Sequence, residues 1–181
     1  MNLKYRVFLL SIYLISFSLS SQDIWNPEES MKIKSISQTD ISNDGKYVAY
    51  VVREAIMKDK KSEFLSQIWV YNTGGSQSIQ YTFNEKSSTS PKFSPDGKKI
   101  AFLSSRSGKN QIWIMNTLGG EAKKLTDEKK GVRSIKWSPD GNNISFLKND
   151  NDTEEETKSK ENKTDVILVD KNFKYSHIYS Y

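Results

Sequence analysis

The ten-residue stretch Lys92-Phe-Ser-Pro-Asp-Gly-Lys-Lys-Ile-Ala101 decides the fold, because related stretches occur three times in the chain. The other two are Asp40-Ile-Ser-Asn-Asp-Gly-Lys-Tyr-Val-Ala49 and Lys136-Trp-Ser-Pro-Asp-Gly-Asn-Asn-Ile-Ser145. Their glycines stand at positions 45, 97 and 141. This spacing is close to the roughly 40 to 50 residues that one four-stranded propeller blade needs. The repeat therefore predicts a row of similar β-units.

Each repeated stretch has the chemistry of a tight β-hairpin. Serine, proline and aspartate suit the first three positions of a type I turn, and glycine suits the next, where a positive φ is needed. Apolar residues alternate after each turn, as Ile100 and Phe102 do, which is the pattern of a strand with one buried face. In the first copy Asn43 replaces the proline, and we expect the same hairpin with a less rigid first corner.

A second repeated element follows each hairpin and is rich in the β-branched and aromatic residues that favour strands. Its copies are Ser66–Thr73, Asn110–Thr117 and, in reduced form, Ser176–Tyr181. A Gly-Gly pair follows each of the first two copies and predicts a turn into a further short strand. The middle unit is therefore predicted as four strands, Ser90–Phe93, Lys99–Ser104, Gln111–Asn116 and Glu121–Thr126.

The predicted fold class is all-β, an incomplete β-propeller of about two and a half four-stranded blades over residues 21–181. The third unit breaks off at Tyr181, inside its third strand. An unpaired strand edge at that point would be a template for aggregation. We therefore expect the chain to be the first part of a longer protein.

Residues 1–20 are predicted to be a signal peptide. Lys4 and Arg6 give a basic start, Val7–Leu19 is apolar, and Ser18-Leu19-Ser20 supplies small residues for cleavage. The apolar stretch is shorter than the roughly 20 residues of a membrane span, which leaves a retained anchor as the alternative. The chain has no cysteine, so no disulfide framework holds the domain. We expect a periplasmic or secreted protein without stable membrane insertion after cleavage.

Residues 148–164 are predicted to be a disordered charged loop. The segment contains no apolar residue, so it cannot contribute to a core. Residues 165–169 are candidates for an extra strand before the chain returns to the third unit.

The charge pattern excludes a nucleic-acid surface. The net charge is +5 at pH 7, but the lysines are spread through turns beside acidic residues. A nucleic-acid surface needs Lys and Arg gathered on one face. We expect no nucleic-acid partner.

An apparent calcium motif fails when its positions are compared with a calcium loop. Asp150, Asp152 and Glu154 resemble the start of such a loop, but Glu155 stands where glycine is required. We therefore predict no metal site.

The remaining candidates for chemistry are explained by architecture. His177 aligns with Gln67 and Gln111 in the repeated strand, and no nucleophile accompanies it. The Asp-Gly pairs are explained as turns, and the large aromatic residues as core, namely Trp69, Trp113, Trp137, Phe93 and Phe102. The chain has no Gly-x-Ser-x-Gly elbow and no paired metal-ligand spacing. We predict no catalytic, cofactor-binding or metal-ligating residue in this chain, and no cofactor.

The order of these motifs resembles the start of the prolyl oligopeptidase family of serine peptidases. Within that family it is most similar to the acylaminoacyl-peptidase and dipeptidyl-peptidase-like secreted members. The residues that carry the resemblance are a leading segment, Asn26–Ser37, directly before the first hairpin, and the stretches Ile41–Val52, Pro91–Arg106 and Gly119–Thr126. The resemblance implies an N-terminal propeller over a C-terminal α/β-hydrolase domain that holds a Ser, Asp and His triad. None of the triad positions lies in this sequence, so no catalytic residue is transferred.

Two functions follow from these motifs. The resemblance implies the N-terminal propeller part of an exported serine peptidase, which admits short peptides to the hydrolase domain. The alternative is a TolB-like periplasmic propeller that binds a partner protein without chemistry, because the Ser-Pro-Asp-Gly hairpin also occurs there. The peptide preference, the oligomeric state and the total number of blades are left open.

Overall fold

A computed structural model describes residues 27–58, 61–162 and 174–181 of the protein. The chain divides into two units, residues 1–33 and 34–181. In the first unit the described residues form the short helix α2 (Pro27–Met31). The predicted signal peptide and the candidate strand at 165–169 lie outside the described residues. None of the helices in the described ranges is long and apolar enough to cross a membrane.

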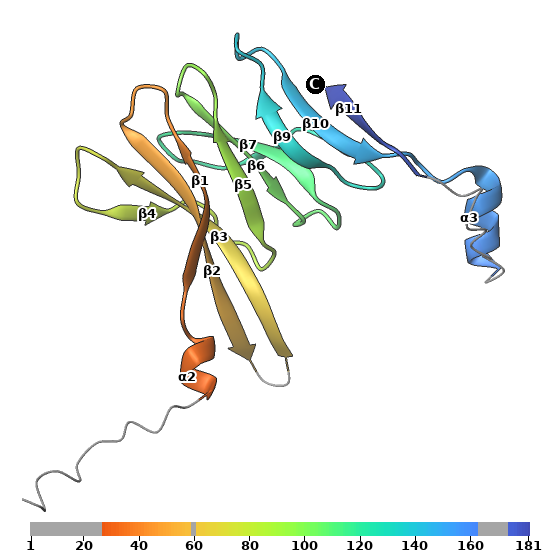
Figure 1. The fold of residues 1–181 in the computed structure, drawn as a ribbon, viewed down its shortest axis with the longest axis horizontal. Helices are drawn as coiled ribbons and strands as arrows, with labels where there is room; N and C mark the ends of the chain where they lie inside the picture. Colours follow the sequence, from red (N-terminus) through yellow and green to blue (C-terminus); the bar gives the residue numbers. More distant parts are fainter. Residues whose placement is uncertain (1–26, 59–60, 163–173) are drawn as a thin grey trace, which may run out of the picture. The chain divides into compact units, whose positions relative to one another are not determined.

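The second unit consists of three antiparallel sheets that follow one another along the chain (Figure 1). The first sheet contains β1 (Ser35–Ile41), β2 (Tyr47–Lys58), β3 (Lys61–Asn72) and β4 (Ser78–Gln80). The second contains β5 (Ser88–Phe93), β6 (Lys99–Ser104), β7 (Gln111–Asn116) and β8 (Lys123–Lys124). The third contains β9 (Arg133–Trp137), β10 (Ile144–Asn149) and β11 (Ser176–Ser180), with β10 in the middle.

These sheets confirm the predicted fold class and the predicted strand order. Each complete sheet is a meander in which every strand pairs with the next one along the chain. In the second sheet β6 and β7 have the predicted bounds, β5 begins at Ser88 instead of Ser90, and β8 is limited to two residues.

The strand β6 differs from the expectation of one buried face, because both of its faces are buried. Ile100 and Phe102 pack in a cluster with Val51 and Ile68 of the first sheet. Ala101 and Leu103 point to the opposite face and pack in a second cluster with residues of the third sheet. The alternation of a strand therefore sends neighbouring residues into two different cores.

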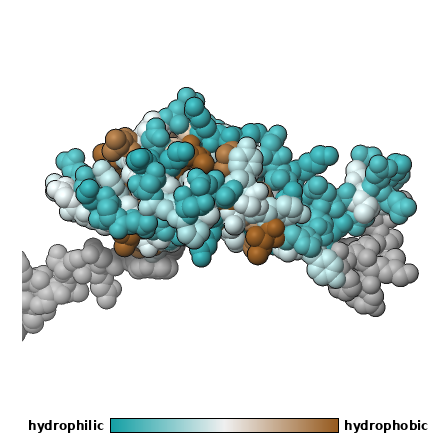
Figure 2. Space-filling view, turned by 90° about the horizontal axis from the view of Figure 1, so that it is seen from above, coloured by the Kyte–Doolittle hydropathy of each residue, from teal (hydrophilic) through white to brown (hydrophobic). Residues whose placement is uncertain are grey.

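The predicted aromatic core is present. Phe93 and Phe102 are buried. Trp113 and Trp137 are partly buried and pack against the first and the second cluster, respectively. Trp69 is half-buried on β3. On the face drawn in Figure 2, hydrophobic residues form separate small areas in a mainly hydrophilic surface.

The prediction of a disordered loop at residues 148–164 is wrong for residues 154–161, which form the helix α3 (Glu154–Glu161), while residues 163–164 lie outside the described residues. Thr153 caps the helix: its side chain accepts from the backbone N–H of Glu156, whose carboxylate accepts from the backbone N–H of Thr153. Such a capping box satisfies two amides that the first turn leaves free. Acidic residues in the first turn and lysines in the last turn further stabilise the helix, because their charges interact favourably with the helix dipole. No residue of α3 is buried, so the segment adds nothing to the core, as predicted.

Candidate functional site

The repeated Ser-x-Asp-Gly turns have the predicted geometry in all three sheets. In the second sheet the N–H of Gly97 donates to the carbonyl of Ser94 at 2.8 Å, and Gly97 has a φ of 70°. The Asp96 carboxylate accepts from the Ser94 hydroxyl at 2.6 Å and from the N–H of Lys98 at 3.0 Å. The same bonds recur in the turns at Ser42–Gly45 and Ser138–Gly141.

The carboxylates of these turns have lowered pKa values. A hydrogen bond from the turn serine is the main cause, and a backbone N–H two residues later adds to it. The three residues are Asp44, Asp96 and Asp140. Each aspartate therefore stabilises its turn as an anion.

Turns of neighbouring sheets touch one another. Asn43, which replaces the proline of the first turn, donates its side-chain N–H to the carbonyl of Pro95 in the second turn at 2.8 Å. A Cβ added to Gly141 in the third turn would lie 3.3 Å from Cδ of the same Pro95. Pro95 therefore contacts the turns on both sides, and Asn43 has a bonding role that the turn chemistry alone does not predict.

The first strand of each sheet contains the same β-bulge. Gln38, Ser90 and Ser134 have φ values of 51°, 53° and 54°, and strand register shifts at or next to each of them. A positive φ at a residue other than glycine is uncommon and costs free energy. The Gln38 side chain accepts from the N–H of Ser90 at 2.8 Å, so the first bulge is bonded to the second.

Polar side chains also connect the first strands. The Asp40 carboxylate accepts from the Lys92 ammonium and from the N–H of Phe93, both at 2.8 Å. The indole N–H of Trp137 donates to the carbonyl of Lys92 at 3.0 Å. We call β1, β5 and β9 with their three turns the inner row. In a propeller, the blades surround a central channel.

A second repeated network involves a glutamine of the third strand in each complete sheet. Gln67 and Gln111 are buried, and each accepts a hydroxyl hydrogen bond from a threonine, Thr82 and Thr126 respectively. His177 occupies the aligned position on β11 but is exposed, with Nε2 3.2 Å from the Asp150 carboxylate. The alignment of His177 with the glutamines therefore predicts its strand but not its environment.

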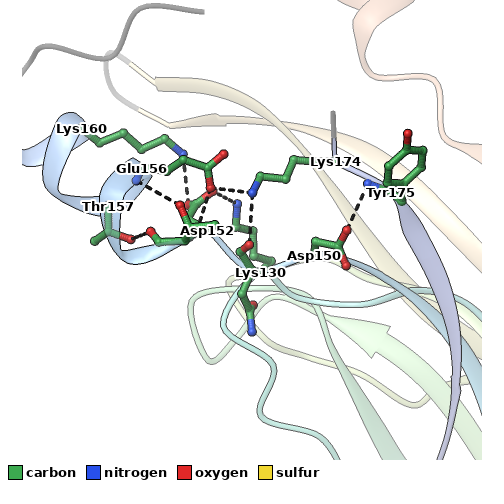
Figure 3. Close-up of polar contacts among 10 residues, drawn as sticks. Lys130, Asp150, Asp152, Glu156, Thr157, Lys160, Lys174 and Tyr175 are labelled. Carbon is green, nitrogen blue, oxygen red and sulfur yellow. Dashed lines mark hydrogen bonds and ion pairs between the residues drawn. The ribbon is translucent and has the colours of Figure 1, made fainter. Parts of the chain in front are cut away.

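Ion pairs hold the described residues of the segment between β10 and β11, which we call the charged insertion (Figure 3). The Asp152 carboxylate pairs with the ammonium groups of Lys130 at 2.5 Å and Lys160 at 3.0 Å, and these bonds lower the pKa of Asp152 to about 2. Lys174 pairs with Glu156 of α3 at 2.5 Å. Lys130 precedes β9, so the insertion is tied to the connection between the second and third sheets.

The acidic residues of the apparent calcium motif do not converge. Asp150 is bonded to the N–H of Tyr175 and to His177, whereas Asp152 faces lysines. Within the described ranges, no group of three acidic, histidine or cysteine residues could hold a metal ion. The absence of catalytic and cofactor-binding residues stays a prediction.

The similarity of the chain to known proteins gives its family. Residues 64–169 match the family described as the Tricorn protease N-terminal beta propeller domain. The chain belongs to this family. The three sheets are therefore propeller blades, and the matched residues run from the first blade through the second and into the third.

Two curated relatives are peptidases by name. The uncharacterized peptidase YuxL of Bacillus subtilis is 43% identical over 76 residues, which are 42% of this chain and 11% of YuxL. Dipeptidyl-peptidase 5 of Porphyromonas gingivalis is 33% identical over 82 residues, which are 45% of this chain and 12% of that protein. The chain thus spans only a small part of the length of either relative.

A solved structure shares the arrangement of the blades. The acylaminoacyl peptidase of Pyrococcus horikoshii superposes with a TM-score of 0.57 at 28% identity, over 70% of this chain and 19% of that protein. Together with the two relatives, it confirms the resemblance to prolyl oligopeptidase-family peptidases that the motifs predicted.

Proposed function

We propose that this propeller belongs to an exported serine peptidase of the prolyl oligopeptidase family and limits which substrates reach a hydrolase domain elsewhere in the full-length protein. The observation that carries the proposal is the superposition on an acylaminoacyl peptidase, together with the family match over residues 64–169. We expect the substrates to be short peptides, because a narrow central channel surrounded by the blades would exclude folded proteins.

The inner row supports a gating role by its rigidity. Its strands are joined by the bonds from Asp40 to Lys92 and Phe93 and from Asn43 to Pro95. A channel bounded by strands that are bonded in this way keeps its width, and a fixed width is what discriminates substrates by size. The close-packed clusters on both sides of β6 also make the blades resist deformation.

Export is part of the proposal. The basic residues Lys4 and Arg6 before the apolar stretch Val7–Leu19 support a cleaved signal peptide. Fractionation of the source cells, with N-terminal sequencing of the mature protein, tests this part separately.

The activity is tested on the full-length protein. A fluorophosphonate probe should label it covalently at one serine. Chromogenic dipeptides and tripeptides should be hydrolysed, whereas a folded protein that contains the same dipeptide and tripeptide sequences should not be. Absence of labelling and of peptide hydrolysis would reject the peptidase function. Capture of a defined protein partner by an unreactive full-length protein would instead support the TolB-like alternative.

The gating role is tested with one contact of the inner row. Asp40→Ala removes the two hydrogen bonds that Asp40 makes to the second blade. The inner row should then hold the channel less tightly, so we expect faster hydrolysis of a long unfolded substrate relative to a tripeptide. Lys34→Ala is the matched control, because it removes an ion pair with Glu54 inside the first blade. The gating role is wrong if the ratio of the two rates is the same in both variants.

A further inference from the structure

A cavity of about 440 Å³ lies between the end of the first blade and the second blade, and the proposed function does not use it. Its volume is in the range of about 300 to 1,000 Å³ that is usual for ligand sites. Trp113, Met115 and Tyr81 form much of its apolar wall, and Phe83 contributes to its lining although it is 74% exposed. Arg106 and Asn84 add polar groups to this wall. We call it the Arg106 cavity.

The hydrogen-bond partners of the Arg106 guanidinium among the described residues are neutral groups. Its Nε donates to the Ser104 hydroxyl and its Nη2 to the Ser88 hydroxyl, both at 3.2 Å. With the Asn84 amide in the orientation that satisfies its hydrogen bonds, the amide oxygen accepts from Nη1 and Nη2 at 3.0 Å. All three partners are neutral, and burial lowers the pKa of Arg106. No carboxylate of the described residues forms an ion pair with it.

A donor that has no acceptor among the described residues lies in the ring beside this cation. The guanidinium carbon of Arg106 is 4.6 Å from the centre of the Trp113 ring. The indole Nε1 of Trp113 is buried and has no acceptor in the part of the chain that the structure describes. A buried donor without an acceptor is destabilising, as is a partly buried charge without a counter-ion. A ligand that brings a negatively charged oxygen into the cavity supplies the Arg106 guanidinium with the counter-ion that it lacks.

We propose that the Arg106 cavity binds a carboxylate that carries an adjacent apolar group, such as the C-terminal end of a peptide. The planar guanidinium group of Arg106 matches the geometry of a carboxylate. The Asn84 amide oxygen lies between Nη1 and Nη2 and accepts from both. A carboxylate oxygen of the ligand takes this position when the Asn84 side chain rotates away. The apolar group packs on Trp113, Met115 and Phe83. Glu121 also lines the cavity but is exposed and forms no ion pair with Arg106.

The test is calorimetric titration of the full-length protein with N-acetylphenylalanine, its amide and inorganic phosphate. We expect the amide to bind at least about tenfold more weakly than the acid, because a charge-assisted pair is replaced by a neutral one. Phosphate should bind more weakly than the acid as well. Equal binding of acid and amide, or no binding of the acid at millimolar concentration, would overturn the proposal.

Two aromatic variants assign the binding to this cavity and not to another site of the protein. Phe83→Ala should weaken binding of the acid by about three- to tenfold, since it removes an apolar contact. Phe64→Ala is the matched control, because Phe64 is 57% exposed on β3 and does not line the cavity. Because Phe83 is exposed, Phe83→Ala should not unfold the protein, so weaker binding by this variant is assigned to the lost contact. An unchanged affinity in Phe83→Ala would reject the site even if Arg106→Lys, which removes the fork, abolishes binding.

Discussion

The glycine of each repeated turn holds a backbone conformation that other residues adopt only at a cost. Gly97 has a φ of 70°, and a Cβ added to it would meet nothing within 4 Å. Gly97→Ala should therefore lower the free energy of unfolding of the propeller by about 1 to 3 kcal/mol through strain alone. Urea unfolding of the full-length protein, followed by tryptophan fluorescence, measures the loss.

The control for this substitution is Gly75→Ala. Gly75 has no positive φ, and a Cβ there would lie 3.6 Å from the nearest atom. Gly75→Ala should therefore leave the free energy of unfolding nearly unchanged. Equal losses in the two variants would show that strain at Gly97 is not the cause.

The aspartates of the turns couple stability to pH. The Ser94 hydroxyl and the N–H of Lys98 lower the pKa of Asp96 in the folded state. A lowered folded pKa means that the anion stabilises the fold above the unfolded value of about 3.9, and that this stabilisation is lost as the pH falls through the folded pKa. Asp96→Asn should be less stable than the parent at pH 7 and lose less stability as the pH falls below about 4. Parallel stability curves for parent and variant would contradict this.

At the scale of elements, helix α3 depends on its cap, because it has no buried residue. A helix of eight residues is marginal in water without such support. Thr153→Ala removes the hydroxyl that accepts from Glu156, and should destabilise the helix by about 1 kcal/mol. Hydrogen exchange of the amides in 154–161 should become faster by the corresponding factor.

Thr153→Ser is the conservative control for the cap. Serine keeps the hydroxyl and should restore slow exchange. If both substitutions have the same effect, the cap does not hold α3, and the ion pairs of Asp152 and Glu156 do so instead.

At the scale of the whole molecule, the blades stabilise one another, and two tryptophans allow this to be measured. The indole N–H of Trp137 bonds to Lys92 of the neighbouring blade, whereas that of Trp113 has no acceptor among the described residues. Trp137→Phe and Trp113→Phe remove the same atoms. We expect Trp137→Phe to cost about 0.5 to 1.5 kcal/mol more than Trp113→Phe in the free energy of unfolding, because only it breaks a hydrogen bond. The connection between blades is rejected if Trp113→Phe is the more costly.

The contacts between blades indicate that each blade depends on its neighbours for stability. The second blade buries one side of β6 against the first blade and the other side against the third. A repeat that depends on its neighbours in this way gains its stability from stacking. Substitutions of buried residues in β6 should therefore lower the stability of both adjacent blades.

The sequence by itself determined the turns, the strand order and the propeller class, because these depend on neighbouring residues. Proline and glycine set φ within the turn from Ser94 to Gly97, and alternation of apolar residues sets the strands that follow. The cap of α3 is also local, but a prediction made from the polar composition of 148–164 overlooked the Thr153 and Glu156 pair.

Only the tertiary structure decided which residues meet across blades. The partners of Asn43, Asp40 and Trp137 lie 45 to 53 residues away along the chain, and no local pattern encodes such a distance. The environment of Arg106 is of the same kind, since it follows from the burial of the guanidinium among neutral partners brought together by packing. Local chemistry therefore forms each blade, whereas burial and long-range hydrogen bonds form the inner row and the Arg106 cavity.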